Sequence, residues 1–216
     1  MDTIQSIHMI QKARAGHLAP AVNGTKNIAP LVREMLFELG EDPHRQGLLK
    51  TPERVARMYT ELLSGYQTDL NELLNDALFD TEYQDMVLVR DVKFYSMCEH
   101  HMLPFFGRAH VAYIPDGKII GLSKIPRLVE MFARRLQVQE RLTHQIADTL
   151  QELLHPKGLA VMLEGAHLCA MMRGVKKDEA RMVTCSRLGA FNTDENLYRN
   201  LLSQIDRQGS AVEWLD

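Results

Sequence analysis

The pattern of hydrophobic positions predicts two helices near the N-terminus. Between residues 28 and 39 apolar residues recur every three to four positions, and Gly40 is placed to end that helix. A second amphipathic stretch over 51–63 opens with Thr51 as the expected N-cap and Pro52 as the first helical residue. We therefore expect a helical region in this part of the chain.

The middle of the chain changes to a pattern that favours strands. The stretches 86–96 and 108–114 are rich in β-branched and aromatic residues, and they flank the segment CEHHMLPFFG. Helical spacing then returns twice, in a stretch that Ser123 can cap and in a longer one over 138–154. We expect a pair of strands followed by two amphipathic helices.

Strand character resumes at 159–172 and 181–191, before a last helix over 195–205. This order, with turn-like links between the strand pairs, predicts an α+β fold with an antiparallel sheet. A length of 216 residues favours one globular unit with a sizeable core. The expected parts are a loosely ordered N-terminal arm, a helical region, a main domain and a C-terminal tail, at residues 1–22, 23–80, 81–206 and 207–216.

The composition argues against several classes of protein. Hydrophobic residues make up 45% and charged residues 25%, which is typical of folded soluble proteins and argues against a disordered chain. No apolar run is long enough for a membrane span, and the N-terminal stretch carries charges where an export signal needs an apolar segment. We expect a cytoplasmic protein without a membrane partner. The formal net charge of −3 provides no general attraction for nucleic acid, so a polyanionic ligand needs a local cluster of cations.

The three cysteines, Cys98, Cys169 and Cys185, are an odd number, which argues against a disulfide framework and favours metal or catalytic roles. Cys98 and His101 are three residues apart, and an odd separation in a strand sends side chains to opposite faces. These two residues can share a metal only if the strand ends there, and Pro104 downstream favours a turn. A C-x-x-H spacing in a turn is typical of zinc ligands.

His167 and Cys169 have an even separation, so in a strand they lie side by side on one face. With Cys98 and His101, Cys169 makes a set of two thiolates and one imidazole, which leaves a fourth tetrahedral position for water, as in catalytic zinc sites. Bound zinc can bring water to a pKa of about 7. His100 and His167 are then candidates for proton transfer.

Less specific interpretations stay open at this point. The same residues can be ordinary buried cysteines and surface histidines, and a structural zinc site can use His100 or His167 as a fourth ligand. Cys185 is interpreted as a small buried hydrophobic residue. A zinc deaminase of nucleobases is disfavoured, because such enzymes need a P-C-x-x-C motif that this chain lacks.

Longer stretches are more specific than the ligand spacing. The segments TPERVARMYTELLSGY, YSMCEHHMLPFFGRAHVAYIP, GLSKIPRLVEMFARRLQVQERLTHQIA and HLCAMMRGV resemble the GTP cyclohydrolase I family, from about Leu31 to about Leu202. The resemblance implies the tunnelling fold, with N-terminal helices before a four-stranded antiparallel sheet that carries two helices on one face. It also implies a ring-shaped homo-oligomer, a decamer of two pentamers, with sites between subunits.

The resemblance implies zinc binding by Cys98, His101 and Cys169, and acid/base roles for His100 and His167. It places the triphosphate of GTP against one serine and four cations, Arg54, Ser123, Lys124, Arg127 and Arg173. A helix N-terminus and arginine are both suited to phosphate, although exposed helix charges explain several of these residues equally well. An inactive family member that serves as a zinc-binding or regulatory subunit is an alternative, which the intact set of residues disfavours.

Glu140 corresponds to the family's guanine anchor, with Gln139 beside it. A carboxylate can accept hydrogen bonds from both N1–H and the 2-amino group of guanine, although an exposed glutamate near a helix N-terminus is also common. The implied reaction converts GTP and water to 7,8-dihydroneopterin triphosphate and formate, the first step of pterin and tetrahydrofolate biosynthesis. Ala166 and the stretch 177–187 depart from the family pattern without removing an assigned residue.

Overall fold

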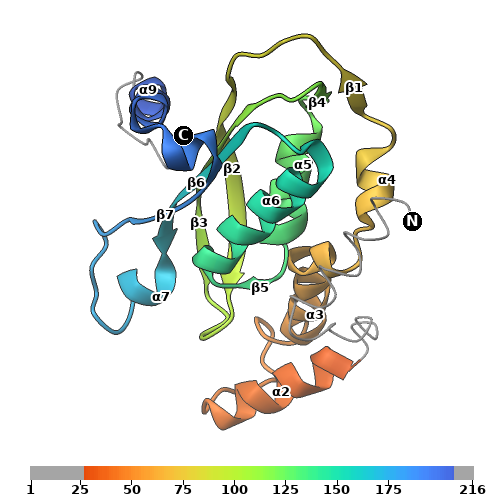
Figure 1. Cartoon of the computed structure of the whole chain (residues 1–216). Coiled ribbons are helices and arrows are strands. Elements are labelled where there is room, and N and C mark those ends of the chain that lie inside the picture. Colours follow the sequence, from red (N-terminus) through yellow and green to blue (C-terminus); the bar gives the residue numbers. More distant parts are fainter. Residues whose placement is uncertain (1–26, 207–216) are drawn as a thin grey trace.

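The computed structural model describes residues 27–206 and arranges them as helices around a twisted sheet (Figure 1). The expected arm over 1–22 and the tail over 207–216 lie outside the described residues. Within 27–206 no helix has both the length and the apolar character needed to cross a bilayer. The division of the rest into 23–80 and 81–206 stays a prediction.

The N-terminal region is helical, as the apolar pattern predicted. Its elements are α2 (Ile28–Glu38), α3 (Thr51–Leu62), the 3₁₀ turn η2 (Ser64–Tyr66) and α4 (Leu70–Leu74). The predicted N-cap of α3 is wrong by one residue, because Lys50 occupies that position and Thr51 is already helical. The short α4 was not predicted, although Asp69 caps it by accepting hydrogen bonds from two backbone amides.

The main sheet has five strands in the order β5-β2-β3-β6-β7. Its members are β2 (Val87–Cys98), β3 (Pro104–Ile114), β5 (Leu136–Gln137), β6 (Gly158–His167) and β7 (Met182–Gly189). The four long strands are antiparallel, whereas β5 pairs in parallel with the end of β2. The expected four-stranded sheet is therefore extended by a fifth strand of two residues. A second, small sheet pairs β1 (Leu78–Asp80) with β4 (Lys118–Ile120).

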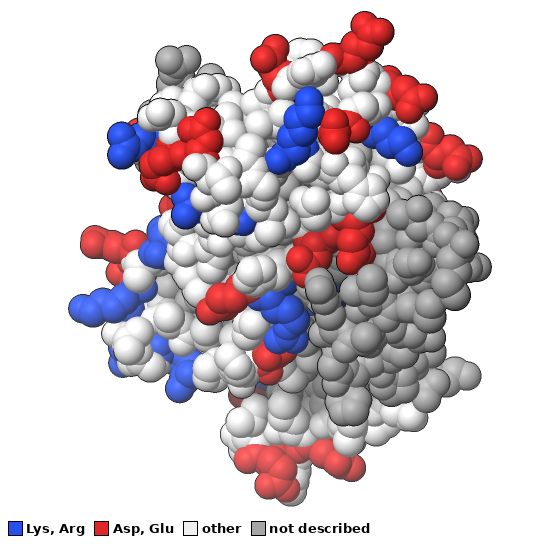
Figure 2. Space-filling view, viewed as in Figure 1, with Lys and Arg blue, Asp and Glu red and all other residues white. Residues whose placement is uncertain are grey.

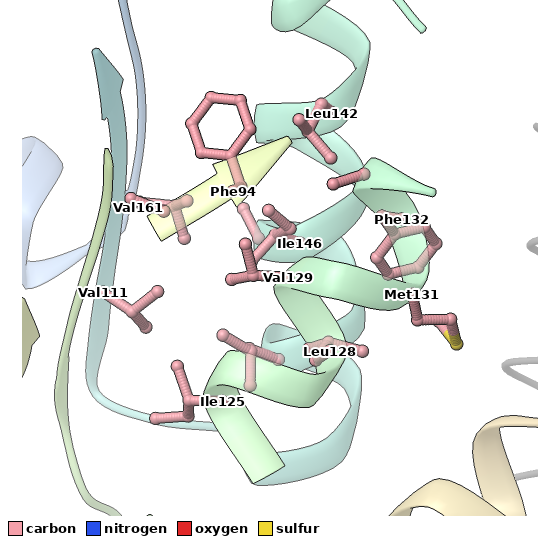
Figure 3. Close-up of a cluster of buried hydrophobic side chains, with 14 of the residues drawn as sticks. Phe94, Val111, Ile125, Leu128, Val129, Met131, Phe132, Leu142, Ile146 and Val161 are labelled. Carbon is pink, nitrogen blue, oxygen red and sulfur yellow. The ribbon is translucent and has the colours of Figure 1, made fainter. Parts of the chain in front are cut away.

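Two helices cover one face of the main sheet, as expected. They are α5 (Lys124–Ala133) and α6 (Gln139–Leu154). Figure 3 shows apolar side chains of both helices, such as Val129 and Ile146, turned toward Val111 and Val161 of the sheet. Burying a side chain of this size contributes about 1.5–3 kcal/mol, so the apolar stripes hold the helices on the sheet.

The opposite face of the sheet carries the last helices, α8 (Ala190–Thr193) and α9 (Glu195–Asp206). Ala112 and Ala160, which alternate with the valines of the first face, pack there against Phe191 and Leu201. The predicted strands at 159–172 and 181–191 are both too long. β6 ends at His167 and is followed by α7 (Leu168–Met171), while β7 ends at Gly189 before α8.

Candidate metal centre and active site

The first two candidate metal ligands lie where β2 ends. Cys98 is the last residue of β2 and is buried, and residues 99–101 form the turn that leads back into β3. Backbone hydrogen bonds close this turn, from the Cys98 N–H to the Leu103 carbonyl and from the Met102 N–H to the Cys98 carbonyl. The turn brings the His101 Nδ1 atom to 3.9 Å from the Cys98 Sγ atom. The strand thus ends at Cys98, which is the condition under which these two residues can share a metal.

The third candidate ligand reaches the same point from a different element. The expectation of one strand through His167 and Cys169 is wrong, because the strand stops at His167 and Cys169 lies in the helical turn α7. The helical turn nevertheless places the Cys169 Sγ atom 4.0 Å from the Cys98 Sγ atom. The ligand atoms of Cys98, His101 and Cys169 all lie within 4.8 Å of one another.

This cluster has the chemistry of a zinc site. Thiolate sulfur and imidazole nitrogen are the usual zinc donors, and three protein ligands leave a fourth tetrahedral position open. Burial, and then the neighbouring Cys98 thiol, raise the pKa of the Cys169 thiol. Two adjacent thiolates therefore need a cation to stabilise them. The donor set fits a zinc ion held by both sulfurs and the His101 imidazole.

His167 ends β6 near this cluster and is held on two sides. Its ring stacks on the buried Phe105 ring of β3, with centroids 4.6 Å apart and planes inclined by 4°. Its Nε2 atom lies 2.9 Å from the Oε1 atom of Gln139, the first residue of α6. Burial lowers the pKa of His167, and the charge of Glu140 opposes part of this effect. The imidazole is therefore favoured in its neutral form near neutral pH.

Gln139 is buried between α6 and the strands β6 and β7. Its Nε2 atom donates to the backbone carbonyls of Leu163 and Met182, at 3.1 and 2.8 Å, and to the Thr184 hydroxyl at 3.1 Å. Its Oε1 atom faces His167. The side-chain amide thus bonds to protein groups at both ends, and its predicted substrate contact stays a prediction.

His100 projects from the turn after β2, and its side chain is 65% exposed. The preceding residue, Glu99, anchors the turn to α6, because one oxygen of its carboxylate accepts hydrogen bonds from two Arg141 nitrogens at 2.8 and 2.5 Å. The other Glu99 oxygen lies 4.0 Å from the His100 Nε2 atom. His100 therefore faces solvent from a turn that a charged pair holds in place.

Two predicted substrate contacts lie at this same end of the molecule. Glu140 is in the first turn of α6 and is exposed, directly after Gln139. Arg173 follows α7, and its guanidinium nitrogen lies 2.8 Å from the His101 Nε2 atom. One cation and one carboxylate that were expected to face substrate are thus neighbours of the metal cluster and of His167.

The predicted triphosphate residues of α5 lie at the other end of that helix. Ser123 is the N-cap and Lys124 the first residue, just after β4. From there α5 runs toward β5 (Figure 1), where Gln137 pairs with Cys98. A helix of 10 residues rises about 15 Å. The start of α5 is therefore separated from the metal cluster by the length of the helix.

Side chains in this second region contact their own surroundings. The Lys124 Nζ atom is buried and donates to the Leu73 carbonyl at 2.8 Å. Arg127 lines a groove of about 480 Å³ between α5 and the segment 64–73. Arg54 is exposed on α3. Glu140 and Arg173 thus lie near the metal ligands, whereas the predicted contacts on α3 and α5 lie apart from them. The substrate roles of all these residues stay predictions.

The chain matches a family model over residues 28–206, and the description of that model is GTP cyclohydrolase I. The chain belongs to the GTP cyclohydrolase I family. Proteins named GTP cyclohydrolase 1 resemble it over most of their length. That of Leptospira biflexa is 57% identical over 83% of this chain and 98% of its own. Those of Chlorobium chlorochromatii and Gloeobacter violaceus are 56% and 52% identical, over 85% and 89% of this chain and 82% and 90% of theirs.

The family match confirms the resemblance in the sequence, and the structure adds neighbours that the sequence did not indicate. In this member of the GTP cyclohydrolase I family, Phe105 stacks on His167 and Arg141 pairs with Glu99. Gly165 lies so close to Gln139 that a Cβ atom there would overlap the Gln139 Oε1 atom. Only the CEHHMLPFFG segment, which holds Phe105 and Glu99 beside the ligands, offered a signal for these contacts.

Charges of both signs line the groove beside α5 in this family member. Figure 2 shows Lys and Arg interspersed with Asp and Glu on the face that carries α5 and α6. Arg134 pairs with Glu130 at 3.3 Å, and Glu72 lines the same groove as Arg127. The groove by itself is thus of mixed charge, whereas a triphosphate favours a cluster of cations.

Proposed function

We propose that this chain is a zinc-dependent hydrolase that converts GTP and water to 7,8-dihydroneopterin triphosphate and formate, the first step of pterin and tetrahydrofolate biosynthesis. The observation that carries the proposal is the cluster of Cys98, His101 and Cys169 beside His167, in a chain of the GTP cyclohydrolase I family. The cytoplasmic location stays a prediction.

The metal ligands have a defined role in this proposal. The Cys98 and Cys169 sulfurs and the His101 imidazole would hold zinc and leave one position accessible to water. Bound zinc would supply Lewis-acid activation of the water that attacks C8 of guanine. His101 is exposed and Cys169 is half-buried, so substrate can approach the cluster from the solvent side.

His167 and His100 serve as the acid/base groups. The lowered pKa of His167 keeps its imidazole neutral near neutral pH, so the ring can accept a proton during opening of the imidazole ring of guanine. Stacking on Phe105 restricts the plane of the ring. His100 lies on the turn next to the ligand His101 and is exposed, so it can exchange protons with substrate and solvent.

Glu140 binds the guanine edge in this proposal. Its carboxylate accepts from N1–H and the 2-amino group, a pair of donors that adenine does not offer. Glu140 is close enough for its charge to act on the pKa of His167. A guanine held at this carboxylate therefore lies near the acid/base group. Gln139, expected beside it, is buried behind the same helix start.

The triphosphate contacts support a site between subunits. Arg173 lies at the metal end, whereas Ser123, Lys124 and Arg127 lie near the start of α5, about the length of that helix away. We propose that α5 of a neighbouring copy, with Arg54, completes the triphosphate site of a ring-shaped homo-oligomer, a decamer in the family pattern. The outer edge of β7 is a strand edge through which copies can pair.

A joint measurement of bound zinc and of formate released from GTP tests this function. We expect about one zinc per chain and one formate per GTP consumed, with a pterin that fluoresces after oxidation. Zinc-loaded oligomer that leaves GTP unchanged would refute the proposal. His167→Ala is the matched control, because it removes an acid/base group outside the ligand set and should lose turnover while retaining the metal.

A further inference from the structure

Gln139 is the centre of a closed set of hydrogen bonds behind His167. The Thr143 hydroxyl donates to the Gln139 backbone carbonyl at 2.8 Å and lies 2.7 Å from the Thr184 hydroxyl. The Gln139 Nε2 atom lies 3.1 Å from that Thr184 oxygen. Gln139 and Thr143 are each 1% exposed, so these groups have protein partners in place of water.

The groups around Gln139 determine which atom donates and which accepts in each of these hydrogen bonds. Because the Thr143 hydrogen goes to the Gln139 carbonyl, the Thr184 hydroxyl must donate to Thr143, and its oxygen accepts from the Gln139 amide. The amide nitrogen also faces the carbonyls of Leu163 and Met182, which can only accept. A flipped amide would place Oε1 against these carbonyl oxygens, so the orientation is determined.

The orientation of Gln139 determines the state of His167. The Oε1 atom can only accept, and it lies 2.9 Å from the His167 Nε2 atom. Nε2 must therefore carry a hydrogen, and in the neutral imidazole Nδ1 is then the nitrogen with the free lone pair. The stack on Phe105 supports the same ring plane from a second direction.

Gly165 provides the space for this contact. It lies on β6, and a Cβ atom there would overlap the Gln139 Oε1 atom and lie 3.6 Å from the His167 Nε2 atom. Any side chain at this position would displace the amide oxygen from the ring. The need for glycine is thus a matter of close approach, since no positive φ is recorded at this position.

We propose that Gln139 is a positioning residue that holds His167 in the tautomer protonated at Nε2, and that Gly165 preserves the space for this hydrogen bond. This inference rests on the proposed function in one respect, because it makes Nδ1 the atom through which His167 accepts a proton from substrate. The side chain of Gln139 then acts on the reaction through His167.

Ring-nitrogen NMR of the whole oligomer tests the tautomer directly. Histidine labelled with ¹⁵N in its ring gives distinct signals for protonated and unprotonated nitrogens, and loss of a signal pair in His167→Ala assigns that pair to His167. We expect Nε2 protonated and Nδ1 unprotonated in the zinc-loaded protein, and a mixture of tautomers in Gly165→Ala. His167 protonated at Nδ1, or ring signals unchanged in Gly165→Ala, would overturn the proposal.

A gentler pair of variants covers the case in which Gly165→Ala does not fold. Thr184→Val removes one of the three acceptors of the Gln139 amide and the donor to Thr143, whereas Thr184→Ser keeps both. We expect Thr184→Val to shift the His167 signals toward a mixture and Thr184→Ser to retain the wild-type pattern. Equal signals in both would contradict the role of the amide network.

Kinetics then separate positioning from substrate binding. If Gln139 acts through His167, Gln139→Leu and Gly165→Ala should lower kcat by about 10- to 100-fold with little change in KM for GTP. A raised KM with unchanged kcat and ring signals would assign Gln139 to substrate instead. Wild-type protein that releases no formate would refute the proposed function alone, since the ring signals are read without turnover.

Discussion

The metal cluster and the predicted triphosphate residues at the start of α5 differ in how the chain brings their residues together. At the metal end, residues separated by about seventy positions meet, as when Cys98 and Cys169 lie 4.0 Å apart. At the start of α5 the candidates Ser123, Lys124 and Arg127 are local neighbours on one helix, and Lys124 is bonded to the Leu73 carbonyl.

This difference indicates which part of the site one chain completes alone. The metal ligands converge through the end of β2 and the α7 turn, so any folded copy contains them all. Arg127 of α5 lines a groove together with the acidic residues Glu130 and Glu72, apart from the cluster. We infer that the first region is set by folding and that the second acquires its function through assembly.

The largest effect is expected from breaking the metal end. Cys169→Ala removes one of three ligands, so bound zinc should fall from about one per chain to nearly none, and formate release should be lost with it. Elemental analysis and a formate assay on the same sample measure both. Cys185→Ala is the matched control, because Cys185 is exposed, contrary to its expected burial, contacts Tyr198 and lies outside the cluster. Full zinc retention by Cys169→Ala would refute the ligand assignment.

The second test mixes two inactive variants. Cys169→Ala lacks the metal end and Arg127→Ala lacks a cation of α5, so a mixed oligomer can contain intact sites only if the two regions come from different chains. Random mixing of equal amounts should restore about a quarter of the sites. Turnover by the co-expressed pair, compared with each variant alone, measures this.

The control for mixing combines Cys169→Ala with His101→Ala. Both residues belong to the cluster of one chain, so no mixture contains an intact cluster and turnover should stay absent. Failure of the Arg127→Ala pair to recover, with mixed oligomers present, would place both regions in a single chain.

A smaller effect is expected at the guanine contact. Glu140→Gln removes the charge and one of two acceptor positions. Loss of a hydrogen bond to a charged group costs about 1.5–3 kcal/mol, equivalent to about 10- to 150-fold in GTP affinity. Equilibrium binding of GTP and of ATP measures the change in purine preference. Glu130→Gln is a control of the same chemistry on α5. Unaltered affinity and preference would count against the anchor.

The smallest effect is expected on the free energy of unfolding in mild acid, through the protonation of His110 on β3. Burial lowers the pKa of His110, with Arg108 and Arg90 acting in the same direction and Asp91 opposing them. Because the folded pKa lies below the unfolded value of about 6.5, the unfolded state binds more protons in acid. The contribution of His110 to the free energy of unfolding should be fully present above the unfolded pKa and should be lost as the pH falls through the lowered folded pKa.

His110→Gln should therefore lose less stability than the wild type between neutral and mildly acidic pH, as measured by urea unfolding at each pH. The exposed His144→Gln is the control. Equal pH dependence in His110→Gln and wild type would exclude His110 as the cause. The comparison separates acid effects on the fold from acid effects on His167.

Much of the fold was predictable because local patterns decide it. The apolar stripes of α5 and α6 follow from spacing, and the turn after β2 follows from the turn residues downstream of it. β5 could not be predicted, since two residues carry no period of their own and only pairing with β2 makes them a strand. The same holds for α4, because a helix of 5 residues is also too short to show a period in the sequence.

Within the site, residue identities were more predictable than their geometry. The three candidate ligands do form a cluster, yet the strand alternation invoked for His167 and Cys169 is wrong because the chain turns into α7 at Leu168. The hydrogen bonds of Gln139 depend on β6 and β7 meeting the start of α6, a tertiary arrangement that no local pattern encodes. Gly165 carried no signal for the same reason.

The two-residue strand β5 has a consequence for chain length. Gln137 is paired with Cys98, and only Val138 separates it from Gln139, so one short stretch of backbone spans from the metal ligand to the partner of His167. One inserted residue would rotate the start of α6 by about 100° relative to β5. A substitution at Val138 keeps this spacing. An insertion or deletion there would misalign Gln139, and with it His167, relative to the metal ligand Cys98.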